Sequence, residues 1–293
     1  MSVLENRLEF WLVSTEHLTD RIWFRDEDDF KMGMNLVAIL ACVLHVDVLA
    51  FILMSNHVHF VLSCSKEMAT EYIDEYKRRY ARYVNRKYGT VELLRRNGRD
   101  VRPIDGNQES LEWAIAYVHM NCVAANICLS PSDYPWGSGG AFFRVKTPKG
   151  RRLGQLSMRA RLRILHTSLE LPSNLLIDDS GYILPESYVQ VELVETLFRT
   201  PKRMLFFLQN SSKAKRRLSS DEDIPAFRDQ VIVSAIPDLC QSLFRKPNMG
   251  YLAENDLTEL LRQLRFRFSS NINQLARISG LSYEKVASLL DKA

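Results

Sequence analysis

Two apolar, β-branched runs separated by only two residues constrain the fold more than any other feature of the chain. The runs are residues 46–54 and 57–63, and only Ser55 and Asn56 lie between them. So short a connection joins antiparallel strands, because a parallel crossover needs roughly a dozen residues or more. The sequence therefore predicts a β-hairpin in the N-terminal half of the chain.

The patterns around this hairpin predict the fold class. Residues 8–13 read as a strand and 26–44 as a helix opened by acids; residues 67–88 form a basic helical pattern, with Gly89 at the C-cap position. Residues 91–108 read as a polar loop or irregular hairpin, and a helix is expected from residue 109 to about residue 127. This order predicts an α+β domain with a ferredoxin-like antiparallel sheet and helices mostly on one face.

The basic, glycine-containing segment 146–154 has the composition of a domain boundary. We therefore expect one domain over residues 1–145 and a second, mainly helical domain over residues 155–293. Near the C-terminus, Ala276 and Gly280 lie four apart and Ser282 can cap a following helix. This spacing predicts a helix-turn-helix that contacts DNA, although an ordinary helical hairpin fits the same pattern.

The distribution of charge indicates a polyanionic partner. The net charge is only +4, but the segment 76–102 holds ten Lys and Arg against two acids, and the segment 144–163 holds eight and no acid. Nucleic acid is the first partner to consider, and solvated helix faces are the alternative. The candidate DNA contacts are Lys77, Arg78, Arg79, Arg82, Arg86, Lys87, Arg95 and Arg96.

Tyrosines interleave with these cations on the basic helix. Tyr80, Tyr83 and Tyr88 suit stacking on unpaired bases beside phosphate contacts. A stripe of tyrosines facing the core is the alternative for Tyr80 and Tyr83.

Several classes of protein are disfavoured by composition. The five cysteines are odd in number and form no Cys-x-x-Cys pair, so neither a disulfide framework nor a thiolate zinc site is expected. The apolar runs are much shorter than the roughly 18 residues that suggest a membrane span, and charges interrupt the first apolar stretch. We expect a cytoplasmic protein that does not cross a bilayer.

His57 and His59 form the first candidate site. Residues two apart in a strand point to the same face, about 6.5 Å apart, so the two imidazoles project together. Two imidazoles on one face can share a divalent metal ion. Two polar residues on an exposed sheet face are the alternative.

Tyr117 and Asn121 lie four residues apart on the helix that follows. The buried stripe of this helix is predicted by the spacing of Leu111, Ile115, Val118, Cys122 and Ala125. A phenol and a carboxamide are expected to protrude together from a neighbouring face, as a nucleophile and an oxygen ligand. His119 lies about 200° around the helix from Tyr117 and is excluded from that site. Packing is the alternative role for Tyr117.

Four strings in order resemble the single-tyrosine HUH transposases, especially the REP-associated tyrosine transposases. FILMSNHVHFVL (51–62) resembles their His-hydrophobic-His strand, and EYKRRYARYVNRKYG (75–89) resembles their basic helix. AYVHMNCVAANI (116–127) is similar to their tyrosine helix, and YPWGSG (134–139) to the motif after it. The resemblance covers roughly residues 8–143.

The resemblance implies a catalytic site on this chain. It implies His57 and His59 as metal ligands, Tyr117 as nucleophile, Asn121 as third ligand, and Mg²⁺ or Mn²⁺ as the metal. The implied reaction cleaves and rejoins single-stranded or hairpin DNA through a 5′-phosphotyrosine. Two departures affect substrate specificity: Cys122 stands where the family commonly has proline, and VELLRRNGRDVRPI (91–104) replaces an aromatic Gly-x-x-Trp stretch.

Two other functions remain open at this point. The chain is alternatively a domesticated relative that holds hairpin DNA without cutting it, or a metal-dependent phosphodiesterase that uses water in place of Tyr117. A covalent protein–DNA adduct separates the proposed reaction from both. The sequence leaves monomer and homodimer both open.

Overall fold

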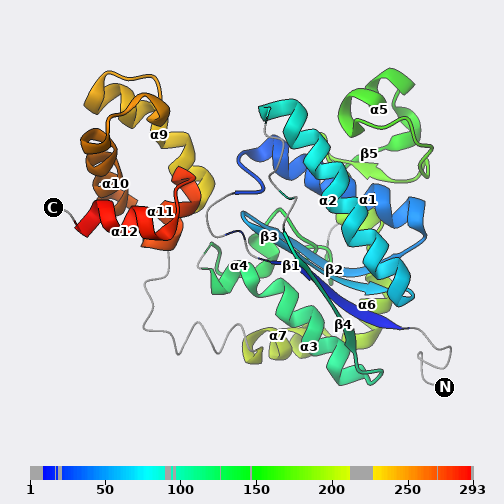
Figure 1. The fold of residues 1–293 in the computed structure, drawn as a ribbon. Helices are drawn as coiled ribbons and strands as arrows, with labels where there is room; N and C mark the ends of the chain where they lie inside the picture. The colour runs from blue at the N-terminus through cyan, green and yellow to red at the C-terminus, as the bar shows by residue number, and fades with distance from the viewer. Residues whose placement is uncertain are drawn as a thin grey trace.

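The computed structural model of the chain describes residues 9–16, 18, 22–89, 94, 97–125, 127–145, 147–211, 227–268 and 270–291 (Figure 1). They form a region built on a four-stranded antiparallel sheet, followed by a mainly helical C-terminal region. The predicted α+β class is confirmed.

The elements up to α3 are strands and helices in the order β-α-β-β-α-β-α, and those after it are mainly helical. In chain order they are β1 (Phe10–Thr15), α1 (Glu27–Leu44), β2 (Asp47–Met54), β3 (His57–Ser63), α2 (Lys66–Tyr88), β4 (Arg99–Ile104), α3 (Gln108–His119), α4 (Asn121–Ala124), β5 (Arg151–Arg152), α5 (Met158–Leu165), β6 (Leu176–Ile177), α6 (Val191–Phe198), α7 (Pro201–Asn210), α9 (Asp229–Phe244), α10 (Glu254–Phe268), α11 (Ile272–Ser279) and α12 (Tyr283–Asp291).

The main sheet has the strand order β2-β3-β1-β4, with every neighbouring pair antiparallel. The predicted hairpin is present, because Met54 pairs with His57 and Leu53 with Val58 across a two-residue turn. β3 is a central strand, and all seven of its residues are buried. Both faces of β3 are therefore covered by other elements.

Helices cover both faces of the sheet, whereas the sequence predicted them mostly on one. Phe60 packs against Tyr72 and Tyr76 of α2, with ring centroids 5.4 Å apart in each case. His59, the adjacent residue, contacts Tyr117 of α3 instead. Successive side chains of a strand point to opposite faces, so α3 lies on the face opposite α2 (Figure 1).

β4 occupies part of the segment that was expected to be a loop or irregular hairpin. It pairs with β1 at the edge of the sheet, and Pro103 lies opposite Trp11. Proline is tolerated in an edge strand, where one side of the backbone has no ladder partner. The strand is polar and has no fully buried residue, which explains why hydrophobic periodicity did not reveal it.

The hydrophobic core of the sheet region continues beyond the linker suggested by the sequence. Val189 bridges to Val48 of β2, and Val194, Phe198 and Phe207 belong to the same buried cluster as the sheet. An ion pair at 2.6 Å between Arg203 of α7 and the buried Glu112 of α3 also connects these two helices. The segment 189–207 thus packs with the sheet.

A small module of β5, β6 and α5 packs on the outer surface of α1. Leu153, Leu165 and Ile177 are buried there against Ala38 and Ile39. The segment 151–177, which overlaps the end of the basic segment 146–154, therefore also belongs to the sheet region.

Helices α9 to α12 share a second hydrophobic core. Its residues include Leu260, Leu275, Val286 and Leu289, together with Ile22 from the segment after β1. Gly280 ends α11 in the left-handed conformation, with φ 70°, and the Ser282 hydroxyl accepts from the backbone of Lys285. The predicted pair of short helices joined by a glycine turn is present.

No helix in the described part of the chain has the length and hydropathy needed to cross a membrane.

Gly33 of α1 lets the helix backbone pack closely against Phe24 and Leu53, and we expect this position to be sensitive to substitution. A Cβ atom there would lie 2.6 Å from the Phe24 ring and 2.9 Å from Leu53, both buried. We predict that Gly33→Ala lowers the free energy of unfolding by about 1–2 kcal/mol, because overpacking exceeds the gain in helix propensity. Gly106→Ala is the matched control, since nothing lies within 4 Å of its Cβ. Equal urea midpoints for the two variants would contradict this prediction.

Candidate active site

The two histidines of β3 lie side by side on the face of the sheet that α3 covers. Their ring centroids are 4.8 Å apart, the rings meet at 86°, and the residues are 5% and 4% exposed. Strand geometry sets this arrangement, because Val58 between them points into the opposite, apolar face. The imidazoles are therefore held close together in a place largely shielded from water.

Tyr117 of α3 completes a three-ring cluster. Its ring centroid lies 5.7 Å from that of His59, again edge to face at 86°. Tyr117 is only partly buried, whereas Ile115, Ala116 and Val118 around it are fully buried. The fold thus brings the predicted nucleophile next to the two predicted metal ligands, although Tyr117 follows the nearer of them, His59, by 58 residues in the chain.

Asn121 differs from its expected position. The predicted helix is interrupted at Met120, and Asn121 begins the short helix α4. Its amide nitrogen donates to the carbonyls of Tyr117 at 2.9 Å and Val118 at 3.1 Å, and the residue is 4% exposed. The carboxamide is folded back onto the end of the preceding helix α3 rather than protruding, so Oδ1 is its only atom available as a ligand.

The residue before the first histidine orients that histidine, a role the sequence reasoning missed. The amide nitrogen of Asn56 donates to the Leu18 carbonyl at 2.8 Å, which turns its oxygen toward His57 Nδ1 at 2.9 Å. An amide oxygen only accepts, so in neutral His57 the proton lies on Nδ1 and the lone pair on Nε2. The available signal was a carboxamide in the two-residue turn directly before His57.

A divalent ion at this site would take its nitrogen ligands from the two histidines of β3. No group of three or more His, Cys, Asp or Glu side chains that could hold a metal occurs among the described residues. His57 and His59 fit a metal ion as a pair of nitrogen ligands, with carboxamide or phosphate oxygens at other positions. Mixed nitrogen and oxygen ligation suits Mn²⁺ at least as well as Mg²⁺.

His119 lies elsewhere, as the helical spacing predicted. It is 1% exposed, its Nε2 is 2.9 Å from the Ser138 hydroxyl, and its ring centroid is 5.5 Å from that of Phe142. Burial lowers its pKa to about 3. His119 is therefore a neutral packing residue.

The cations of α2 do not share a face of the sheet with the histidines. Several are engaged within the protein: Lys87 contacts Asp26 and Asp29, both at 2.8 Å, and Lys77 donates to the Asn97 carbonyl. Arg78 and Arg79 both pair with Glu75. Arg82 and Arg86 are exposed and form no ion pair with other described residues. Arg95 and Arg96 lie outside the described residues.

The tyrosines of α2 are largely packing residues. Tyr80 is fully buried, and its hydroxyl donates to the Trp23 carbonyl. The prediction that Tyr80 stacks on a base is therefore wrong. Tyr83 and Tyr88 are half-buried, and the Tyr88 hydroxyl donates to Asp26 and Asp29.

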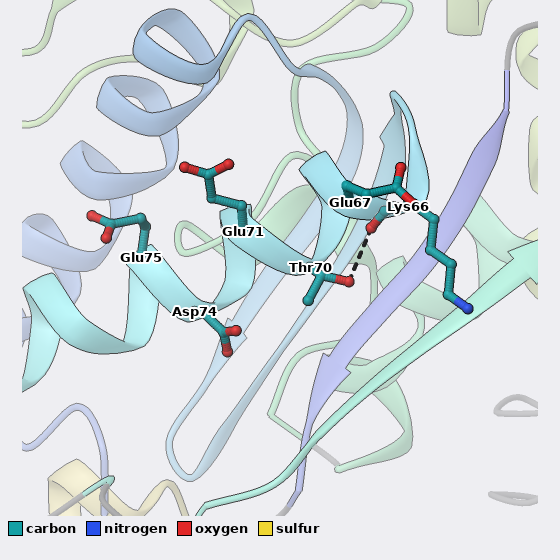
Figure 2. Close-up of a pocket in the computed structure, with 6 residues that line it drawn as sticks. All are labelled: Lys66, Glu67, Thr70, Glu71, Asp74 and Glu75. Atoms are coloured by element: carbon teal, nitrogen blue, oxygen red, sulfur yellow. Dashed lines mark hydrogen bonds between the residues drawn. The ribbon is translucent and has the colours of Figure 1, made fainter.

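A shallow pocket along the N-terminal half of α2 has the wrong charge for DNA. It is lined by Lys66, Glu67, Thr70, Glu71, Asp74 and Glu75 (Figure 2). The lining holds four carboxylates against one ammonium group, and Arg78, Arg79 and Arg99 offset part of that charge by pairing with Glu75 and Asp74, so this end of the helix does not extend the basic surface.

The cations of the C-terminal helix pair are engaged in ion pairs. Arg277 of α11 bonds to the buried Asp229, and Lys285 of α12 pairs with Glu254 at 2.9 Å. Each is the only Lys or Arg within the bounds of its helix. Two short helices joined by a glycine turn are present, but their charges do not favour phosphate contacts.

Comparisons with known proteins leave the site to be interpreted from its own geometry. No family model matches the chain, and neither the curated proteins nor the solved structures contain a match.

The buried, neutral state of His119 predicts a dependence of stability on pH. The folded protein binds this proton less tightly than the unfolded chain, whose histidine has a pKa near 6.5. The stabilisation is thus complete above about pH 6.5 and falls toward lower pH, by up to about 1.4 kcal/mol per pH unit. In urea unfolding at about pH 7 and about pH 5, His119→Gln should lose less stability than the wild type. Parallel losses would contradict the assignment.

Proposed function

We propose that this protein is a metal-dependent DNA strand transferase of the single-tyrosine HUH type, which cuts and rejoins single-stranded or hairpin DNA. The observation that carries the proposal is the cluster of Tyr117, His59 and His57, with neighbouring ring centroids 5.7 and 4.8 Å apart. The strand order β2-β3-β1-β4 in a β-α-β-β-α-β sequence agrees with a ferredoxin-like sheet. Both features support the resemblance in the sequence.

Tyr117 is the nucleophile in this reaction. Its hydroxyl oxygen attacks a DNA phosphorus atom, and the bond from that phosphorus to the 3′-oxygen breaks. The phenol loses one proton and the departing 3′-oxygen gains one, leaving a 5′-phosphotyrosine and a free 3′-hydroxyl. Rejoining is the reverse attack by a 3′-hydroxyl, and it needs no ATP because the phosphoester bond is conserved in the adduct.

His57 and His59 would hold the divalent ion, and Asn121 Oδ1 is the candidate third ligand. Bound there, Mg²⁺ or Mn²⁺ supplies Lewis-acid polarisation of the scissile phosphate and offsets its developing charge. The Asn56 oxygen at His57 Nδ1 makes Nε2 the His57 atom that would bind the ion, and the burial of both rings limits competing water. The chain's own contribution is thus to orient the ligands beside Tyr117.

Arg82 and Arg86 are the α2 residues best placed to contact DNA. They are exposed, and they lie on the helix that covers the sheet face opposite Tyr117. Their position supports a DNA ligand that extends around the sheet, well beyond the scissile phosphate.

Tyr117→Phe tests the proposed reaction. We expect this variant to form no covalent adduct with single-stranded hairpins in Mn²⁺, while its affinity for DNA stays within a few-fold of the wild type, because only one oxygen is removed. Denaturing gels measure the adduct, and fluorescence anisotropy measures the affinity. Adduct formation by Tyr117→Phe would place the nucleophile elsewhere, and cleavage without any adduct would favour hydrolysis by water.

Charge reversal on α2 tests the DNA surface. The double variant Arg82→Glu, Arg86→Glu should reduce the slope of log affinity against log salt by about 1.4, or about 0.7 for each lost contact to a single strand. Arg78→Glu, Arg79→Glu is the matched control, and we expect a smaller change because Glu75 already pairs with both. The assignment fails if the control has the larger effect.

One observation favours a second function, that of a DNA hairpin-binding protein that does not cut. Asn121 is buried and its amide is tied to helix carbonyls, so the third ligand is not presented in the expected way. Under this alternative the wild type binds hairpins but forms no adduct at any Mn²⁺ concentration.

A further inference from the structure

The turn that carries the first histidine is held on its backbone by the segment after β1. The Ser55 carbonyl accepts from the backbone of Trp23 at 2.7 Å, and the Asn56 carbonyl accepts from that of Leu18 at 3.1 Å. His57 follows directly, as the first residue of β3. A displacement of this turn is therefore transmitted to His57 over one or two residues.

The side chain of the turn bonds to the C-terminal helices. Ser55 Oγ donates to Asp229 Oδ2 at 2.8 Å, across 174 positions in the sequence. The Asp229 carboxylate, in a residue only 4% exposed, also accepts from Gln274 at 2.8 Å and from Arg277 at 3.0 and 3.2 Å. Asp229 thus links the histidine turn to α11.

Two neighbours of Asp229 contact the same side of the sheet region. Gln230 donates to the Phe24 carbonyl at 2.7 Å, and the Arg228 guanidinium lies 5.8 Å from the centroid of the Tyr134 ring. Tyr134 in turn donates to the Leu53 carbonyl of β2 at 2.7 Å. The start of α9 therefore meets the hairpin and its support at three points.

From these contacts we infer that Asp229 is a positioning residue for His57, acting through Ser55, and that the C-terminal helices are part of the catalytic structure. The inference rests on the proposed function, because it assigns the turn a role in metal binding and cleavage. It also means that the first 145 residues lack one of the supports of the site.

The energetics of a buried ion pair support an orienting role. Burying Asp229 and Arg277 costs desolvation, and apolar residues often stabilise a fold as well as such a pair does. The Asp229 carboxylate, however, accepts hydrogen bonds from Ser55, Gln274 and Arg277, and such charge-assisted bonds fix the positions of their donors. Metal ligands and reacting groups need placement within about 0.5 Å, so a fixed turn benefits the site directly.

The isosteric pair Ser55→Val and Ser55→Thr tests the link in the full-length protein. Valine removes the hydroxyl and threonine keeps it, while Arg277 and Gln274 still satisfy Asp229 in both. We expect Ser55→Val to bind Mn²⁺ on the order of tenfold more weakly by calorimetry without DNA. Its kcat for cleavage should fall while KM for DNA stays within about twofold. Ser55→Thr should resemble the wild type in each measurement.

The imidazole resonances of His57 in the metal-free protein provide a readout independent of metal and DNA. They should shift in Ser55→Val and remain unchanged in Ser55→Thr. This readout tests the link even if the wild type forms no adduct, an outcome that would count against the proposed function.

Gln230→Ala is the control for general loosening, because it removes a hydrogen bond at the same junction that reaches the turn only indirectly, through Phe24, whose backbone N–H donates to the Ser55 carbonyl at 3.3 Å. We expect near-normal Mn²⁺ affinity and His57 resonances in this variant. Equal behaviour of Ser55→Val and Ser55→Thr would overturn the inference. Equal losses in Ser55→Val and Gln230→Ala would overturn it too, by showing that the junction acts only as packing.

Discussion

The pairing of β3 between β2 and β1 is the constraint on which the rest of the structure depends. Because its residues alternate between two covered faces, Phe60 enters the aromatic core with α2 while His59 meets Tyr117 of α3. A shift of one residue in register would exchange these faces and place the imidazoles in the apolar core. The two-residue turn at Ser55 and Asn56 fixes the register, and so it also fixes the candidate site.

Local patterns predicted the elements whose signals are local. The side chain of Asp26 caps α1, Gly89 ends α2 with φ 68°, and the hairpin forms where the apolar runs placed it. Hydrophobic periodicity could not reveal β4, whose pairing with β1 depends on backbone bonds along a polar edge. The sequence also did not reveal that Tyr80 is buried, because its spacing fits a core stripe and a stacking surface equally well.

Only some of the residues predicted to form the site lie together in the fold. His57, His59 and Tyr117 converge, while Asn121 turns back onto the end of α3 and the cations of α2 lie on the other side of the sheet. The link from Ser55 to Asp229 spans 174 positions and has no signature in composition or spacing. The candidate site on a central strand thus draws support from segments on both sides of it in the chain, including helices that the sequence assigned to a separate domain.

The most direct test of the central claim is to locate the covalent bond to DNA. Full-length protein is incubated with single-stranded hairpin DNA and Mn²⁺, digested with protease and nuclease, and analysed by tandem mass spectrometry. We expect a nucleotide linked through its 5′-phosphate to the peptide that contains Tyr117, and loss of that species in chelator. A nucleotide on another residue, or DNA cut without any linked peptide, would contradict it.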